Sequence, residues 1–322
     1  MSSRDRLPVV VWTVAVLLTA AAACWRPAGL LPAARATLGP FVTLAAIIAG
    51  SALAGRAGVF RALARLLIRD RVPRAVAAVS VLVFTALLSG LVNLDVAVGV
   101  AMPVALAAAR QHRMPAGRLA AAVAITANAA SFLLPTANIT NLLLLGRVPL
   151  QALAYLRGSW LAWLLVTVIT LGPLSAWLAR SGTGPARASG DRPSARMALD
   201  LMPMFLAASA IRALLARGIA LHASFAAQLA GGTALAAGLN NLPAAAALHP
   251  AGRAGLWAAI LAASIGPNLV ITGSVATLIC RRIARQAGAR LSAWQFTAIG
   301  SALIPAQFAV ATLGLHLTGA LR

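Results

Sequence analysis

The sequence predicts an all-α membrane protein that crosses the bilayer many times, and two observations support this prediction. First, 61% of the 322 residues are hydrophobic and only 10% are charged, with a mean hydropathy of +0.89, whereas a soluble domain carries roughly a quarter charged residues. Second, the apolar residues form long runs such as LPVVVWTVAVLLTAAAAC, and a helix needs about 20 apolar residues to cross the hydrocarbon core. A multi-pass protein of the cell membrane is therefore expected.

The formal net charge of +22 comes from Arg alone, because the sequence has neither Lys nor Glu. The Arg residues lie mostly between apolar runs, as in RAGVFRALARLLIRDRVPR. This pattern is typical of residues that flank membrane spans and of cytoplasmic loops, and it favours contact with anionic lipid over nucleic acid. Two Cys and four His show no disulfide or metal-ligand spacing, so no metal or other cofactor is expected apart from a coupling proton or sodium ion.

The first half, residues 1–179, begins with a span over 8–25. Arg4 and Arg6 before it also fit a secretory signal, but the length of the apolar run favours a first transmembrane helix. This extra helix is followed by spans over 38–55 and 74–91, with an amphipathic, Arg-rich interfacial helix over 56–71 between them. Two unusual apolar segments, 91–110 and 120–146, contain Asn, Asp, Thr, Ser and Pro, and a plain span over 158–179 follows.

Residues 180–198 are rich in Gly, Pro, Ser and Arg and form the predicted linker. The second half, residues 199–322, has expected spans over 199–216, 222–238 and 293–318. Its segment GLWAAILAASIGPNLVITGSVATLIC is again apolar and interrupted by polar residues.

The two halves repeat one order of motifs. Each has a helix that leads into an Asn-and-Pro segment, LVNLDVAVGVAMP in the first half and AGLNNLPAA in the second. Each then has a run with a polar centre, ASFLLPTANITN and ASIGPNLVITGSVAT, and closes with a plain span. Interrupted apolar segments at corresponding positions of two halves point to the binding site of a transporter.

The interruptions are expected to break helices inside the membrane, where freed backbone groups must face protein or water. A half-helix that begins there favours an anionic or polar oxygen, and oxygens of Asn, Thr and Ser can coordinate a hard cation such as sodium. The alternative is that these polar residues only join neighbouring helices. The predicted helix-breaking residues are Pro103, Pro135, Pro243, Gly266 and Pro267.

Asp95 is the one acidic residue of five that lies well inside an apolar region. A carboxylate in that environment is costly and marks an ion or proton path by default. A fixed ion pair or a helix cap is the alternative interpretation.

These motifs resemble the arsenite permease ArsB family. LVNLDVAVGVAMP is similar to its first re-entrant motif, LLPTANITNLLLLG to its Ser-Asn-Leu-Thr-Asn motif, GLNNLPAA to its Asn-Asn-Leu-Pro motif, and GPNLVITGSVATL to its Gly-Pro-rich motif. The resemblance covers about residues 38–318, although Ala137 replaces a usual Ser, and Val270 and Ile271 replace a Thr-Pro pair. It places the chain in the ion transporter superfamily, which also includes citrate and sodium–dicarboxylate carriers and sodium–proton antiporters.

The resemblance implies two inverted repeats with re-entrant hairpins and broken helices, about nine to eleven membrane segments in all. It also implies a central substrate or ion site that both halves line. Its residues, carried over by position and completed with the polar residues of the breaks, are Asn93, Asp95, Thr136, Asn138, Thr140, Asn141, Asn240, Asn241, Asn268, Thr272, Gly273, Ser274 and Thr277.

Several functions compete on this basis. The leading expectation is a secondary active transporter that exports arsenite or antimonite, with an ion gradient or an associated ATPase as the energy source and a homodimer as its assembly. The alternatives are a sodium-coupled di- or tricarboxylate carrier, a sodium–proton antiporter, and a membrane subunit that does not transport. The sequence has no nucleotide-binding phosphate loop and no clustered acid, base or metal residues, so an enzyme is not expected.

Overall fold

The computed structural model describes residues 6–58, 62, 72–182, 201–215, 219 and 224–322. Within these residues the chain forms thirteen α-helices and two short 3₁₀ helices, and its one β-contact is an isolated bridge between Ile219 and Leu248. The prediction of an all-α polytopic fold is confirmed. Helices α4, α5, α8 and α14 are long and apolar enough to cross a bilayer, and their bounds follow below.

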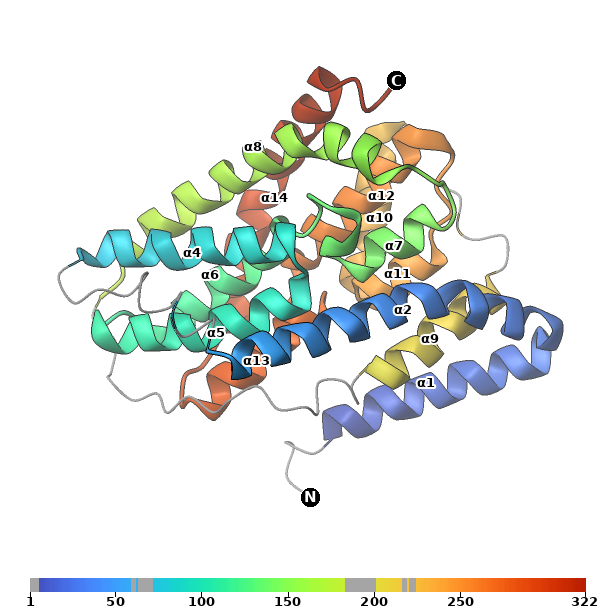
Figure 1. Ribbon diagram of the computed structural model, residues 1–322, viewed down its shortest axis with the longest axis horizontal. Helices are drawn as coiled ribbons and strands as arrows, with labels where there is room; N and C mark the ends of the chain where they lie inside the picture. The colour runs from blue at the N-terminus through green and yellow to red at the C-terminus, as the bar shows by residue number, and fades with distance from the viewer. Residues whose placement is uncertain (1–5, 59–61, 63–71, 183–200, 216–218, 220–223) are drawn as a thin grey trace.

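Three helices form a bundle at one side of the molecule (Figure 1): α1 (Arg6–Trp25), α2 (Pro27–Arg56) and α9 (Leu201–Leu214). Small residues let them approach closely, since Ala22 and Ala33 pack against Ala210 and Ala213. α2 is longer than the predicted span over 38–55 because the helix continues through Pro32 and Pro40. At 30 residues it extends about 45 Å.

The first repeat consists of a helical hairpin, a broken helix and a long closing helix. The hairpin is α4 (Arg74–Leu91) and α5 (Leu94–Gln111). The broken helix is α6 (Ala116–Ala129), the 3₁₀ helix η1 (Pro135–Ala137) and α7 (Ile139–Leu145). The closing helix is α8 (Ala152–Ala179).

The second repeat has the same order of elements. Its hairpin is α10 (Phe225–Leu239) and α11 (Asn241–Ala247). Its broken helix is α12 (Gly252–Ile265), η3 (Gly266–Leu269) and α13 (Val275–Gln286), and α14 (Ala293–Leu317) closes it. α6 and α12 have 14 residues each, whereas α5 has 18 and α11 only 7. The repeats therefore differ mainly in the length of their half-helices.

The two closing helices pack against each other in opposite directions. Thr318, just after α14, donates its hydroxyl to the Gly158 carbonyl near the start of α8 at 3.0 Å. Further along, Gln307 donates to the Thr170 hydroxyl at 2.7 Å. Residue numbers thus rise along α8 as they fall along α14. Because the two helices hold equivalent places, this antiparallel pairing fits the predicted inversion of the repeats.

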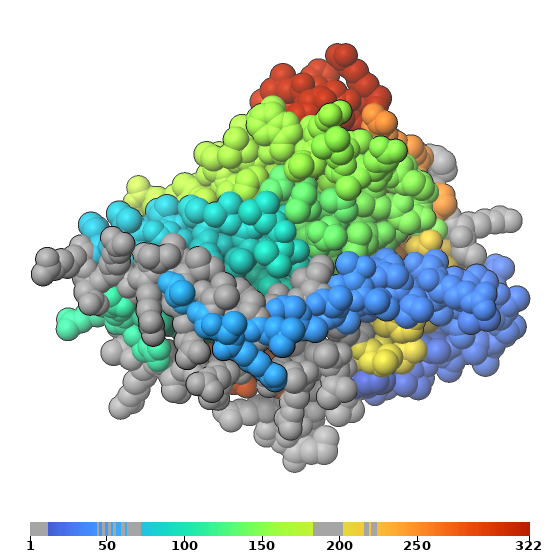
Figure 2. Space-filling model, in the orientation of Figure 1, coloured from blue at the N-terminus to red at the C-terminus, as the bar shows by residue number. Residues whose placement is uncertain are grey.

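Large apolar side chains cover the outside. Trp160, Leu164 and Val168, spaced one turn apart on α8, are exposed, and Figure 2 shows α8 and α2 lying on the surface of the molecule. A large exposed apolar surface of this kind is characteristic of contact with a membrane.

Two of the five predicted helix-breaking residues, Pro103 and Pro243, do not lie at a break. α5 continues through Pro103 to Gln111, so the helix does not break there. A proline removes one backbone donor, and tightly packed membrane helices tolerate that loss. Pro243 lies in the first turn of α11, and the break precedes it at Asn240. Pro135, Gly266 and Pro267 lie in 3₁₀ helices at the interruptions, as expected.

Two sequence predictions lie largely outside the described residues. These are the amphipathic helix over 56–71 and the linker over 180–198. The division of the chain at that linker stays a prediction.

Candidate functional site

In the first half, the tip of the hairpin is tied to the break of the broken helix. Asn93 is the N-cap of α5, and its side-chain oxygen accepts from the Asp95 backbone N–H at 2.9 Å. Its amide nitrogen donates to the Thr136 carbonyl in η1 at 3.1 Å. One Asn side chain therefore starts a helix and satisfies a carbonyl that the break leaves without a helical partner.

The second half repeats this arrangement. Asn240 is the N-cap of α11, and its oxygen faces the Leu242 backbone N–H at 3.4 Å. Its amide nitrogen donates to the Thr272 carbonyl at 2.9 Å, and the next residue, Asn241, donates its backbone N–H to the Gly273 carbonyl at 2.8 Å. The Asn240 backbone has φ 79°, outside the usual region for a non-glycine residue.

Asn128, near the end of α6, joins the two halves. Its amide nitrogen donates to Asn268 Oδ1 at 2.9 Å and to Thr277 Oγ1 at 3.0 Å. Its own oxygen accepts from the Ser274 hydroxyl at 2.9 Å. Asn268 in turn donates to the Ile125 carbonyl at 3.2 Å. All of these side chains are buried, so the two breaks are held together by a closed polar network. We call this network, together with the adjoining hairpin tips at Asn93–Asp95 and Asn240–Asn241 and the two breaks, the polar centre.

Four helices begin around this network, and each has a polar N-cap. The caps are Asn93 for α5, Asn138 for α7, Asn240 for α11 and Ser274 for α13. Two of the four, α5 and α13, run for several turns and pack against each other. Their N-termini carry partial positive charge into the middle of the molecule.

The predicted site residues separate into a buried and an accessible group. Asn138 donates to the Ser131 hydroxyl at 3.1 Å, and Asn141 donates to the Ser131 carbonyl at 3.0 Å. The Thr140 hydroxyl and Asn141 Oδ1 are buried without a protein partner. The group with no or little exposure is Asn93, Asn138, Thr140, Asn141, Asn241, Asn268, Gly273, Ser274 and Thr277.

The accessible group consists of Asp95, Thr136, Asn240 and Thr272. They lie at the two hairpin tips and the two breaks, where the chain can present polar groups to a solute. Among the described residues no ion pair involves the Asp95 carboxylate. It lies in the first turn of α5, where the helix dipole favours a negative charge.

Sequence reasoning missed Asn128 and Ser131. Both lie in the run TANAASFLLP, immediately before the interruption that was recognised. The available signal was a polar side chain in an Ala-rich stretch, whereas Asn138 is predicted from its place after Pro135 and from the family resemblance.

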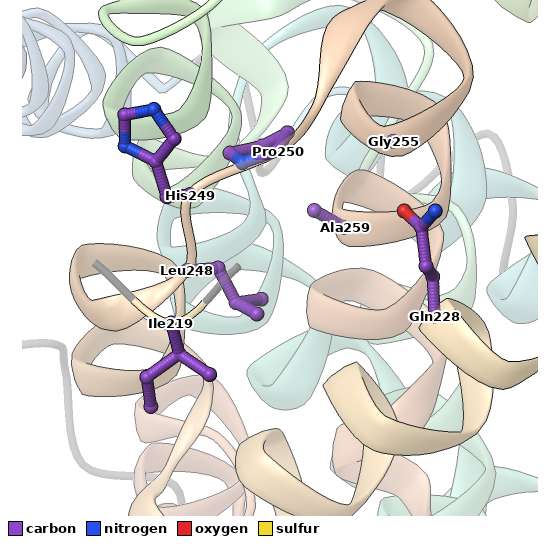
Figure 3. A pocket seen from close by; sticks show the side chains of 7 residues that line it. All are labelled: Ile219, Gln228, Leu248, His249, Pro250, Gly255 and Ala259. Carbon is purple, nitrogen blue, oxygen red and sulfur yellow. The ribbon is translucent and has the colours of Figure 1, made fainter. Parts of the chain in front are cut away.

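A small hollow lies away from the centre, at the turn between α11 and α12 (Figure 3). Leu248 and Ala259 face it, Gln228 lies opposite, and the His249 ring turns away. Apolar groups dominate its wall, so it does not resemble a site for an ion. The described residues also contain no cluster of three metal-ligating His, Cys, Asp or Glu side chains.

Comparison with known proteins identifies one family. The model of the CitMHS family, described as citrate transporters, matches residues 4–304. No curated protein matches the chain. The match covers the first repeat, the second repeat up to the middle of α14, and all residues of the polar centre. It supports the ion transporter superfamily that the motifs indicated. The narrower ArsB assignment is not confirmed.

Proposed function

The chain belongs to the CitMHS citrate transporter family, and from that premise we propose that it is a secondary active carrier of a citrate-like di- or tricarboxylate in the cell membrane. The family makes the chain a membrane transporter and not an enzyme. The substrate, the coupling ion and the membrane are the proposed parts.

The observation that carries this proposal is the convergence of α5 and α13. Both helices begin in the polar centre, at Asn93 and Ser274, and both direct backbone N–H groups towards it. A helix N-terminus is a favourable environment for a carboxylate. The accessible Thr136, Asn240 and Thr272 supply hydroxyl and amide groups around it.

Asp95 is the proposed coupling residue. It is partly exposed at the hairpin tip, and no described residue neutralises its carboxylate. An intramembrane carboxylate without a fixed partner can take up and release a proton or a cation during transport. Its position two residues after the Asn93 cap places this event next to the substrate groups.

Arsenite is a second candidate, and a different observation favours it. Apart from Asp95, the polar side chains of the centre are Asn, Ser and Thr, and the described hydrogen bonds of that centre include no basic side chain. Such a lining also suits a neutral hydroxide, because no guanidinium is present to select for charge.

One experiment separates the two candidates. Purified chain is reconstituted into proteoliposomes, and uptake of labelled citrate and of arsenite is measured under imposed proton or sodium gradients. Citrate uptake that collapses when the gradient is dissipated supports the carboxylate proposal. Gradient-dependent movement of arsenite without citrate transport would overturn it and establish the second candidate.

A further inference from the structure

Side-chain contacts divide the helix ends into two faces. Arg74 at the start of α4 donates to the Gly182 carbonyl, and Arg118 at the start of α6 donates to the Ser181 hydroxyl. These contacts bring the starts of α4 and α6 to the end of α8. The opposite face contains the start of α8, where Gly158 meets Thr318 after α14.

The first face is the arginine-rich face. Directly before α4 in sequence lies the Arg-rich stretch 56–71. The described Arg residues of this face are Arg56, Arg74, Arg110, Arg113, Arg118, Arg180, Arg281, Arg282, Arg285 and Arg290. An excess of Arg in short loops favours the cytoplasmic side, so this rule accounts for basic residues here but not on the opposite face.

Three basic side chains from three separate elements lie on the opposite face, where α9 packs against α11 through Ala208 and Ala246. Arg147 follows α7, His249 lies in the turn between α11 and α12, and Arg212 lies in the last turn of α9. Arg147 Nη1 is 3.1 Å from His249 Nδ1, and Arg147 Nη2 donates to the Ala246 carbonyl at 2.9 Å. Because Arg has only donors, His249 Nδ1 accepts, which leaves its Nε2–H free to donate.

This cluster has no acidic partner among the described residues. Asp95 is the only acidic side chain described, and it lies at the polar centre. The buried Nε of Arg147 has no hydrogen-bond partner. Burial and, next, repulsion by Arg212 lower the pKa of Arg147 to about 10. Like charges that come together with no counter-charge among the described residues favour the binding of an anion.

A short path connects the cluster to the polar centre. α7 and α11 pack side by side, and each runs from a central cap to this face. Each has seven residues, so the cluster lies about 10 Å from the caps at Asn138 and Asn240.

From this geometry we propose that Arg147, Arg212 and His249 form an entry site that binds the carboxylates of the transported anion on the face opposite the arginine-rich face. The proposal rests on the proposed carboxylate transport and adds to it a second binding place and a direction of access. The guanidinium groups supply charge and paired donors that suit a carboxylate.

The test uses Arg212→Gln, because Arg212 makes no described hydrogen bond that the change would remove. Wild type and variant are placed in nanodiscs of neutral phosphatidylcholine, and citrate binding is measured by calorimetry at low and high salt. Arg157→Gln is the matched control, since Arg157 is an exposed arginine on the same face and outside the cluster. Citrate uptake by each protein is measured in parallel.

We expect Arg212→Gln to weaken citrate binding about tenfold and to reduce its salt dependence, while Arg157→Gln matches wild type. Thermal stability should be unchanged or higher, because a repulsion is removed. Equal affinity of Arg212→Gln and wild type, or no citrate binding by wild type, would overturn the entry site. If affinity is equal but Arg212→Gln retains less anionic lipid on purification, the cluster is a lipid site. Citrate binding without uptake by wild type would instead contradict the proposed transport alone.

Discussion

The side-chain amide of Asn128 donates a 2.9 Å hydrogen bond to the amide oxygen of Asn268, and this bond joins the two repeats at their interruptions. The same amide group also reaches Thr277 and accepts from Ser274. One side chain of the first half therefore satisfies three polar groups of the second, in a place where water cannot replace them.

Replacing Asn128 with Ala should destabilise the protein strongly. The change leaves the buried oxygen of Asn268 and the hydroxyls of Ser274 and Thr277 with fewer partners, at a cost of about 3 kcal/mol. Thermal unfolding in detergent measures the effect. Thr167→Val is the control, because the Thr167 hydroxyl is buried without a partner and its loss should be neutral. Equal melting temperatures for both variants would contradict the joining role of Asn128.

The helix interruptions could be predicted because they have a local cause. Pro135, Gly266 and Pro267 lack a donor or a side chain, and each lies in a run where Asn, Ser or Thr can replace the missing bonds. The outcome at Pro103 shows the limit of that reasoning. A single proline in α5 costs one hydrogen bond, and close packing on both sides keeps the helix intact.

The partners of the polar residues could not be predicted, because they depend on how the halves meet. Asn128 and Asn138 look alike in sequence, yet one crosses to the second repeat and the other stays within the first. The lengths of α11 and α5 could not be predicted either. Both helices are apolar, and only the packing determines where each hairpin ends.

Replacing Asp95 with Asn should separate substrate binding from ion coupling. The amide keeps the size of the side chain but cannot carry the charge of a proton cycle or neutralise a cation. We expect gradient-driven citrate uptake to fall at least about tenfold, while exchange of citrate across the membrane without a gradient persists. Asp95→Glu retains the carboxylate and should keep part of the uptake. Full gradient-driven uptake by Asp95→Asn would exclude Asp95 from coupling.

Replacing Gly300 with Ala should disturb the polar centre from outside. Gly300 lies on α14, and an added Cβ would overlap the Asn268 carbonyl oxygen. Either α14 or η3 must then move, which costs about 1–3 kcal/mol in a packed interior. Gly172→Ala on α8 is the matched control, because a Cβ there meets nothing within 4 Å. Unfolding of both variants in detergent gives the comparison, and equal stabilities would show that α14 or η3 moves at no cost in stability.

Gly and Ala substitutions at the two hairpin tips should have unequal effects. Asn93 has an extended backbone with φ −173°, whereas Asn240 has φ 79°. Each substitution removes the bonds of the Asn side chain, but Ala at position 240 must also hold a backbone conformation that suits glycine, at about 1–3 kcal/mol. At position 93 only the cap preference of Gly over Ala contributes, so Asn93→Gly should be more stable than Asn93→Ala by roughly 0.5–1 kcal/mol. At position 240 the backbone conformation adds to this preference, so the margin of Asn240→Gly over Asn240→Ala should be wider. The four melting temperatures, measured in one detergent, give this double difference directly. Equal margins at the two tips would mean that the Asn240 backbone relaxes, and that the two hairpin tips are alike in backbone as well as in hydrogen bonding.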